Sequence, residues 1–200
     1  MKIILLGATG TIGQAIAKLL APHHDVVKVG NRHGDFKVDI SSIASIRKLF
    51  QDIGSFDAVV CAAGLAKFGS LEELRDEDYL LGLNNKLMGQ VNLVRVGRSY
   101  IQDKGSFTLT SGVLSQHPMP GSSSISMINA GIEGFVRAAA LEMKRGLRVN
   151  AVSPVWVKET MVILGMDSSS GMPADQVAFA YRESVEGRRN GEILNVRDFA

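Results

Sequence analysis

The sequence predicts one α/β domain of 200 residues, built on a doubly wound parallel sheet of about seven strands with helices on both faces. Short apolar runs alternate with amphipathic stretches along the whole chain. The first of these runs leads through a glycine-rich turn into a helix, the unit that binds a dinucleotide. No linker or low-complexity segment divides the chain, so we expect residues 1–200 to form a single nucleotide-binding domain.

Composition and charge narrow the range of functions. A net charge of +2 with scattered lysines and arginines offers no patch suited to nucleic acid or to a membrane surface. No apolar stretch is long enough to span a membrane. The single cysteine, Cys61, indicates a reducing compartment, and we expect a cytoplasmic protein. No set of His, Cys, Asp and Glu has metal-ligand spacing, so we expect no metal site.

The first twenty residues carry the strongest functional signal. A predicted strand at residues 1–6 is followed by GATGTIG at residues 7–13 and by an amphipathic helix at 14–20. Gly7 would permit the sharp turn, Gly10 would let backbone N–H groups approach a phosphate, and Gly13 would let the helix pack closely on the strand. A glycine-rich turn without a ligand is the alternative. The turn residues expected to contact the cofactor are Gly7, Thr9, Gly10, Thr11, Ile12 and Gly13.

The end of the second predicted strand, residues 25–30, indicates which cofactor is bound. A dinucleotide-binding fold reads the ribose about 20 residues after the glycine turn, and an acidic residue there would bind the 2′-hydroxyl. This chain has Asn31 and Arg32 instead, which favours the 2′-phosphate of NADP(H) over NAD(H). An exposed loop arginine is the alternative for Arg32, and Asp35 could still contact a ribose.

The rest of the chain continues the alternation of strands and helices. Ser70 and Glu73 have the spacing of a capping box, which predicts that a helix follows. Residues 155–172 have no clear period and contain the only tryptophan, Trp156; we interpret them as a substrate lid, with a disordered insertion as the alternative. Further strands are predicted at 36–40, 56–62, 106–110, 148–153 and 192–196, and helices at 42–53, 76–101, 123–143 and 173–185.

Six stretches together match one known family. They are GATGTIG at 7–13, VDI at 38–40, CAAG at 61–64, GSFTLTSG at 105–112, EGFVRAAALEM at 133–143 and LRVNAVSP at 147–154. On these stretches the chain resembles the short-chain dehydrogenase/reductase family over essentially its whole length. The resemblance implies a seven-stranded Rossmann sheet in the order 3-2-1-4-5-6-7. The three-and-three glycine spacing is like that of extended and atypical members.

The resemblance also implies which residues line the cofactor. Asp39 would contact the adenine, and the small residues Ala62, Ala63 and Gly64 would lie along the cofactor. The matching stretches VDI and LRVNAVSP add Ile40 and Pro154 to the expected cofactor-binding residues.

The resemblance fails at the residues that carry out the chemistry. Members of the family reduce carbonyls or oxidise alcohols with an Asn, a Ser, a Tyr and a Lys. Alignment without gaps puts Lys86 at the Asn position, Gly112 at the Ser position, Ile125 at the Tyr position and Asn129 at the Lys position. Because isoleucine cannot donate a proton, we expect an atypical member in which ordinary ketone reduction is impaired.

Three residues are candidate substitutes, and two of them have a simpler alternative. Lys86 could protonate an intermediate or hold a phosphate, or it could be a solvated surface lysine. Ser111, one residue before the Ser position, could hydrogen-bond the substrate or the nicotinamide. His117 could act as an acid near neutral pH, or it could be an ordinary loop residue.

Three functions therefore stay open. The first is an NADP(H)-dependent oxidoreductase acting on a small carbonyl, enone or quinone, because activated substrates need less help from an acid. The second is a non-catalytic NADP(H)-binding redox sensor or regulatory module, and the third is a structural remnant that binds nothing. The resemblance also implies a homodimer or homotetramer through the helices at 76–101 and 123–143.

Overall fold

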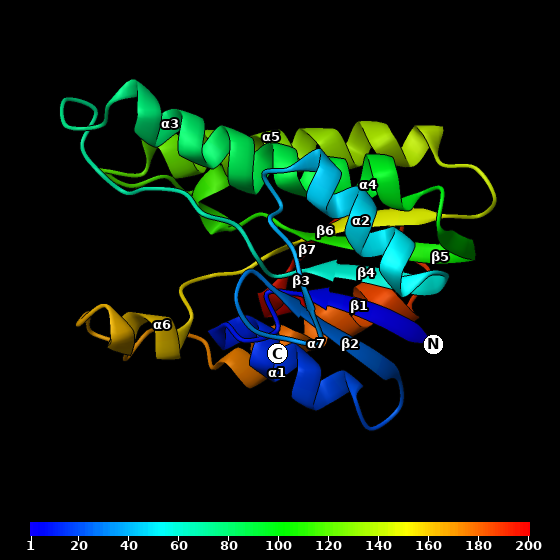
Figure 1. The fold of residues 1–200 in the computed structure, drawn as a ribbon. Helices are drawn as coiled ribbons and strands as arrows, with labels where there is room; N and C mark the ends of the chain where they lie inside the picture. The colour runs from blue at the N-terminus through cyan, green and yellow to red at the C-terminus, as the bar shows by residue number, and fades with distance from the viewer.

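A seven-stranded parallel sheet runs through the middle of the protein in the order β3-β2-β1-β4-β5-β6-β7 (Figure 1). The structure is a computed structural model and describes residues 1–200. Neighbouring strands pair in parallel across the whole sheet, which confirms the predicted fold class and strand order. The strands are β1 Lys2–Leu6, β2 Asp25–Gly30, β3 Phe36–Lys37, β4 Phe56–Cys61, β5 Ile101–Thr110, β6 Arg148–Ser153 and β7 Ile193–Asn195.

Helices cover both faces of the sheet. In Figure 1, α1 and α7 lie below the sheet, α2, α4 and α5 lie above it, and α6 projects at the left beyond the carboxyl ends of the strands. No helix is long and apolar enough to cross a membrane. The helices are α1 Thr11–Leu20, α2 Ile43–Ile53, α3 Asp76–Gly82, α4 Met88–Gly97, α5 Ser123–Glu142, α6 Lys158–Ile163 and α7 Ala174–Glu186.

Each face of the sheet has its own hydrophobic core. Successive side chains of a strand point to opposite faces, so Ile4 and Leu6 of β1 pack toward α2, α4 and α5 while Ile3 and Leu5 pack toward α1 and α7. All four side chains are fully buried. A strand buried on both faces must be apolar at every position, which explains the continuous IILL run of the sequence.

The predicted long helix at 76–101 is wrong in detail. The segment forms α3, then a π-helical turn over Leu83–Leu87, then α4, which ends at Gly97. Ile101 fits the helical period of the apolar residues before it, but it is the first residue of β5 and pairs with Phe56 of β4. The apolar period alone therefore could not separate the end of the helix from the start of the strand.

The predicted capping box does not form at Ser70 and Glu73, because the Glu73 amide donates to the Ser70 carbonyl oxygen and not to its hydroxyl. Glu73 Oε2 accepts hydrogen bonds from the Ser70 amide at 3.2 Å and the Ser70 hydroxyl at 2.8 Å, and both close a turn. The helix begins later, at Asp76, where the Asp78 carboxylate accepts from the Arg75 amide at 3.1 Å. The helix start at residue 76 agrees with the predicted bounds, but the carboxylate at that start belongs to Asp78 and not to Glu73, whose bonds serve a turn.

Other differences concern the ends of elements. The first helix starts at Thr11, inside the glycine turn, and β3 has only two residues because the chain leaves the sheet edge toward α2. Ser42 lies just before α2 and accepts a hydrogen bond from the Ser45 amide, as a helix cap. Residues 155–172, for which a disordered insertion was the alternative, are ordered: they contain α6 and an isolated bridge between Val157 and Met172.

Candidate active site

The glycine turn has no room for side chains at two of its three glycines. Gly7 has φ 79°, and a Cβ there would lie 2.6 Å from the carbonyl oxygen of Ala62 in the adjoining segment. A Cβ at Gly13 would collide with the carbonyl oxygen of Gly7. At Gly10 a Cβ would meet only that same oxygen, at 3.4 Å, so the bare backbone of Gly10 leaves one side of the turn open to a ligand.

The N-terminus of α1 lies at this open side of the turn. Gly10 precedes the helix, and no side chain caps its first N–H groups. Unsatisfied N–H groups together with the positive end of the helix dipole bind phosphates well. The turn therefore fits the pyrophosphate of a dinucleotide, and Thr11, Ile12 and Gly13 would present the amides that hold it.

Two adjoining cavities extend from the turn along the carboxyl edge of the sheet. One, of about 190 Å³, lies at the ends of β1, β2 and β4, and the other, of about 400 Å³, lies at the ends of β4, β5 and β6; Ala63 and Gly64 line both. The first is lined by Leu6, Gly7, Thr9, Gly30, Asn31, Val38, Asp39, Ile40, Leu65 and Asn85 in addition. The second is lined in addition by Ile12, Ala62, Ala66, Phe68, Lys86, Thr110, Gly112, Val113, Leu114, Ile125, Asn129, Pro154, Val155, Trp156 and Thr160.

The polar residues near the smaller cavity are not equally free to meet a cofactor. Asn31 and Asp39 line it, but the Asp39 carboxylate already accepts hydrogen bonds from the amide and hydroxyl of Ser41, at 2.9 and 2.6 Å. Arg32 is exposed beside it and does not line it. The Asp35 carboxylate accepts from the Lys28 amide at 2.8 Å, so this carboxylate is used within the β2–β3 connection.

Lys86 is the only charged residue in the lining of the larger cavity. Its ammonium donates to Asn129 Oδ1 at 2.8 Å and to the Ser111 carbonyl oxygen at 3.2 Å. Burial lowers the pKa of Lys86 to about 8, because water stabilises an ammonium better than the protein interior does. Lys86 belongs to none of the salt bridges of the protein. The site therefore contains a cation with two neutral acceptors.

Local backbone features bring Lys86 to this place. It lies in the π-helical turn between α3 and α4, a geometry that often occurs at functional sites. Gly64 packs directly on its side chain, and a Cβ at Gly64 would lie 2.6 Å from Lys86 Cγ. Gly64 also has φ 147°, which favours glycine. The CAAG stretch and Lys86, far apart in the sequence, thus form one wall of the cavity.

The structure brings only some of the candidate residues together. Ile125 and Asn129 of α5 line the same cavity as Lys86, and Gly112 lies beside Asn129. Ser111 does not line the cavity. Its hydroxyl donates to the Val152 carbonyl oxygen at 3.3 Å, and its own carbonyl oxygen accepts a hydrogen bond from the Lys86 ammonium. His117 is exposed in the loop after β5 and does not line the cavity either.

No tyrosine reaches the cavity. Tyr181 is fully buried under the sheet, where its hydroxyl bonds to Thr110 at 2.7 Å and burial raises its pKa. The Tyr79 hydroxyl lies 2.9 Å from the Ser123 hydroxyl, and Tyr100 packs against Phe50. The phenol that the family mechanism uses therefore has no counterpart among the residues lining this cavity.

Two aromatic residues of the cavity were not predicted as site residues. The rings of Phe68 and Trp156 stack with centroids 5.8 Å apart and an interplanar angle of 23°. Phe68 follows β4 and Trp156 follows β6, so they approach from separate strand ends. The position of a lone tryptophan just after a predicted strand was a signal for Trp156, whereas no sequence signal pointed to Phe68.

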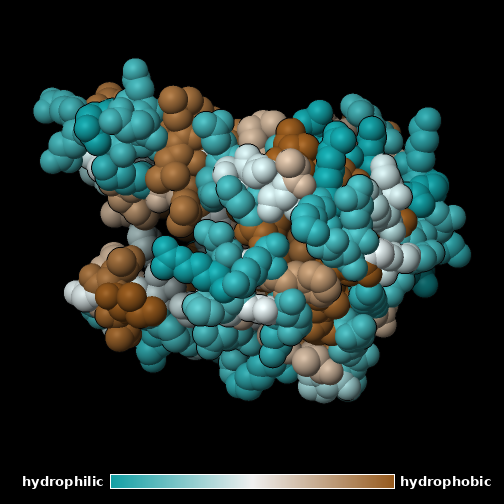
Figure 2. Space-filling model, viewed as in Figure 1, coloured by the Kyte–Doolittle hydropathy of each residue, from teal (hydrophilic) through white to brown (hydrophobic).

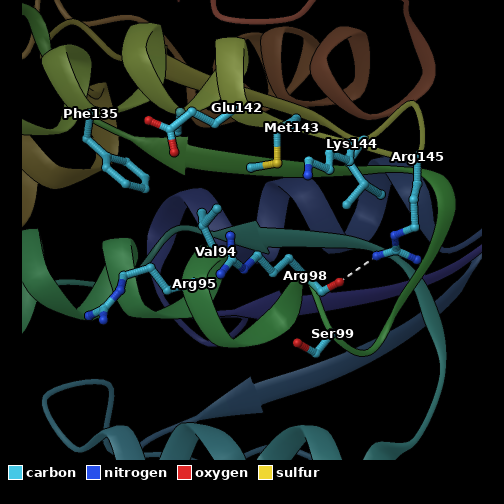
Figure 3. A pocket seen from close by; sticks show the side chains of 11 residues that line it. Val94, Arg95, Arg98, Ser99, Phe135, Glu142, Met143, Lys144 and Arg145 are labelled. Atoms are coloured by element: carbon cyan, nitrogen blue, oxygen red, sulfur yellow. Dashed lines mark hydrogen bonds between the residues drawn. The ribbon is translucent and has the colours of Figure 1, made fainter.

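A third cavity, of about 360 Å³, lies elsewhere, between the C-terminal ends of α4 and α5 (Figure 3). Its lining includes Arg95, Arg98, Lys144 and Arg145. Arg145 donates to the carbonyl oxygens of Arg98 and Ile101 and pairs with Asp103 at 2.9 Å. The cavity lies toward the amino end of β5, away from the glycine turn, and we assign it no part in the chemistry.

Comparison with known proteins identifies the family. A family model described as Enoyl-(Acyl carrier protein) reductase matches residues 14–198. The chain belongs to the short-chain dehydrogenase/reductase family. The family is one of oxidoreductases that bind a nicotinamide cofactor. The predicted Rossmann fold and the open glycine turn agree with that cofactor.

Solved structures share the whole fold of this short-chain dehydrogenase/reductase. The protein lin1944 from Listeria innocua is 40% identical, with a TM-score of 0.95 over 98% of this chain and 99% of the other. A small-chain dehydrogenase in complex with NADPH is 28% identical, with a TM-score of 0.86 over 98% of this chain and 95% of the other.

Curated relatives are reductases by name. Hydroxynaphthalene reductase arp2 of Aspergillus fumigatus is 29% identical over 76% of this chain and 60% of the relative. The 3-oxoacyl-[acyl-carrier-protein] reductase of Mus musculus is 26% identical over 78% of this chain and 75% of the relative. The short-chain dehydrogenase/reductase described here thus spans about 60% of the length of the fungal relative.

Proposed function

We propose that this protein is an NADP(H)-dependent oxidoreductase that transfers hydride between NADP(H) and a small carbonyl, enone or quinone. One observation carries the proposal: the cavity beside the glycine turn and the cavity containing Lys86 share the wall formed by Ala63 and Gly64. A dinucleotide held by the turn would extend along this wall toward Lys86. When bound, the cofactor supplies the hydride.

We further propose that the protein lacks the usual Asn-Ser-Tyr-Lys set and uses Lys86 as the proton donor. Lys86 and Asn129 occupy the family's Asn and Lys positions in exchanged form, and their side chains are hydrogen-bonded at 2.8 Å. Asn129 Oδ1 would orient the ammonium, and Lys86 Nζ would hold a proton for the oxygen of the substrate. A pKa of about 8 keeps this group mostly protonated at pH 7 and still able to release the proton.

The substrate class follows from the same chemistry. A quinone or an activated enone needs less acid assistance than a simple ketone, and the Ile125 side chain offers none. The named relatives act on hydroxynaphthalenes and on 3-oxoacyl groups of acyl carrier protein, according to their names. Ten of the 17 residues lining the larger cavity are hydrophobic, which favours a largely apolar substrate.

The preference for NADP(H) rests on the end of β2. Arg32 is exposed beside the smaller cavity, where its guanidinium could turn toward a 2′-phosphate. The two acidic residues that could bind a 2′-hydroxyl instead, Asp35 and Asp39, are both engaged in hydrogen bonds within the chain. The NADPH complex of a structural relative that is 28% identical supports the same choice.

A non-catalytic NADP(H)-binding sensor is the second candidate. It is favoured by the absence of a tyrosine from the cavity lining and by the Ser111 hydroxyl, which bonds to the Val152 carbonyl rather than facing the cavity. The sensor and the oxidoreductase would have the same cofactor site and would differ only in whether hydride is transferred to a substrate. It predicts NADPH binding without turnover on any carbonyl or quinone.

Titration of the purified protein with NADPH and NADH, by calorimetry or nicotinamide fluorescence, tests the cofactor site first. Tighter binding of NADPH is expected. A panel of ketones, enones and quinones, with NADPH oxidation as the readout, then separates enzyme from sensor. If neither cofactor binds, both candidate functions are wrong.

We also propose that the protein forms a homodimer or homotetramer through α4 and α5. One side of α5 is exposed, with Met127 at 43% and Leu141 at 89% accessibility and the small residues Ala130, Gly134 and Ala138 between them. A flat helix face of this kind packs well against a second copy of itself.

The single buried cysteine, Cys61, supports a reducing compartment such as the cytoplasm.

A further inference from the structure

We propose that the larger cavity takes an aromatic ligand that carries an oxyanion, with the anion at Lys86 and the ring against Phe68 and Trp156. The inference rests on the proposed function in one respect, since it names the class of substrate that would reach the cofactor. Its physical basis is separate: a cation without a counter-ion and an aromatic pair line the same cavity.

The charge of Lys86 is not balanced within the protein. Its two acceptors, Asn129 Oδ1 and the Ser111 carbonyl oxygen, are neutral, and no carboxylate pairs with it. The titratable group that acts on it is the thiol of Cys61, whose pKa burial raises to about 12, so that this thiol is uncharged at neutral pH. A buried ammonium without a counter-ion is costly, and an incoming anion would reduce that cost.

A third donor of Lys86 stays free for such an anion. An ammonium has three N–H donors, and the structure uses two. The remaining donor belongs to a group that lines the cavity. A neutral carbonyl, enone or quinone could accept this hydrogen bond, but it would balance the charge only when hydride transfer places a negative charge on its oxygen. A carboxylate, enolate or phenolate would accept the third hydrogen bond and also balance the positive charge of Lys86.

The aromatic pair specifies the rest of the ligand. Phe68 is 44% exposed although its ring stacks on Trp156, so the pair presents apolar surface at the mouth of the cavity. Figure 2 shows a hollow at the left between the α3 segment above and α6 below, with a hydrophobic patch on α6. The exposed side chains of this patch are Val162, Ile163 and Leu164. Flat apolar rings pack against such surfaces and gain additional binding energy when they stack on an aromatic ring.

The pyrophosphate of the cofactor does not meet this need. Gly7 and Thr9 of the turn that would hold it line the smaller cavity, whereas Lys86 lines only the larger one, which Ile12 at the start of α1 also borders. Lys86, in the π-helical turn before α4, and the N-terminus of α1 are thus two separate positive groups from different elements. We assign the first to the substrate and the second to the cofactor.

Binding of matched probes to the cofactor-free protein tests the inference. Phenylpropanoate and its neutral counterpart phenylpropanamide differ only in the charged group, and the emission of the sole tryptophan, Trp156, reports occupancy beside it. Calorimetry gives the affinities. We expect the carboxylate to bind about tenfold or more tightly than the amide, and the preference to disappear in Lys86→Gln and to persist in Lys86→Arg. Pentafluorophenol, which is ionised at neutral pH, tests a ring-bound oxyanion in the same way.

Two controls make the result specific. Lys158→Gln removes an exposed lysine at the start of α6 and should leave the preference unchanged. Phe68→Ala should weaken the acid and the amide by the same factor, because it removes ring contact but no charge. Tighter binding of either anionic probe supports the inference and identifies the kind of oxyanion. Equal affinities for charged and neutral probes, or a preference that survives in Lys86→Gln, would overturn it. Because no cofactor is added, this outcome is independent of whether NADPH binds.

Discussion

Lys86 Nζ lies 2.8 Å from Asn129 Oδ1, so the side chains of two helical segments meet across the larger cavity. The gap-free alignment with the family predicts an asparagine and a lysine at these two positions in the opposite order. On that alignment the ammonium of this protein would extend from the other wall of a cavity whose lining contains no phenol, and Lys86 would then be the group placed to deliver a proton.

Replacement of Lys86 by glutamine should reduce turnover on any accepted carbonyl, enone or quinone by about 10²–10⁴, the usual contribution of a positioned acid. NADPH affinity should change little, because the glycine turn is intact. Steady-state kinetics and NADPH titration measure the two effects separately. Lys158→Gln serves as the control, and full activity in Lys86→Gln would rule out Lys86 as the proton donor.

The pH dependence of reduction should report the same group. Burial lowers the pKa of Lys86 to about 8, so the ammonium is present below that pH and lost above it. We expect kcat/KM for reduction to be level below pH 8 and to fall about tenfold per pH unit above it. A profile that stays level through pH 9 would contradict this assignment.

Stability should show the lowered pKa without any assay of activity. Between the folded pKa of about 8 and the usual value of 10.5, the unfolded chain binds more protons than the folded one, so stability rises with pH in this window. Relative to Lys86→Met, the wild-type protein should gain about 1 kcal/mol in unfolding free energy from pH 7 to pH 9. Urea unfolding of both proteins measures this difference, which would be absent if Lys86 were solvated.

Two helical glycines should respond in opposite ways to alanine. In Gly13→Ala the new Cβ collides with the Gly7 carbonyl oxygen, so we expect lower stability and loss of NADPH binding. Within one chain a Cβ at Gly134 meets nothing within 4 Å, and Gly134→Ala should raise the stability of the monomer by about 0.5–1 kcal/mol because it removes the entropy cost of a helical glycine. Thermal melts and cofactor titration test both. Normal NADPH binding by Gly13→Ala would show that the turn is not the cofactor site.

Removal of Arg32 should change the choice of cofactor. A hydrogen bond to a charged group contributes about 1.5–3 kcal/mol, so Arg32→Ala should weaken NADPH binding about tenfold or more and leave NADH binding unchanged. Arg188→Ala, which removes another exposed arginine, is the matched control. An equal loss for both cofactors would mean that Arg32 does not bind the 2′-phosphate.

A charge on the exposed face of α5 should block self-association. Ala138 is exposed between Gly134 and Leu141, and Ala138→Arg would place a cation where we propose a second copy packs. Sedimentation should show an oligomer for the wild-type protein and a monomer for the variant. An oligomer of unchanged size in Ala138→Arg would place the interface elsewhere.

The sequence by itself determined the sheet and the glycine turn. The β1 strand is buried on both faces and therefore apolar throughout, and the turn tolerates no side chain at Gly7 or Gly13, so both leave local signals in the residue types. Strand order followed from resemblance to the family and is confirmed by the pairing of the strands. Where a boundary depended on long-range pairing, as Ile101 with Phe56, the local apolar period was misleading.

Only the tertiary structure decided which candidates share a site. Lys86, Asn129, Phe68 and Trp156 come from four separate segments, and no local pattern relates one to another. Ser111 and His117 were as plausible in sequence as Lys86, but the Ser111 hydroxyl bonds to Val152 and His117 is exposed. A hydrogen bond between residues 43 positions apart depends on how helices pack over the sheet, and the spacing of residues along one chain does not encode that packing.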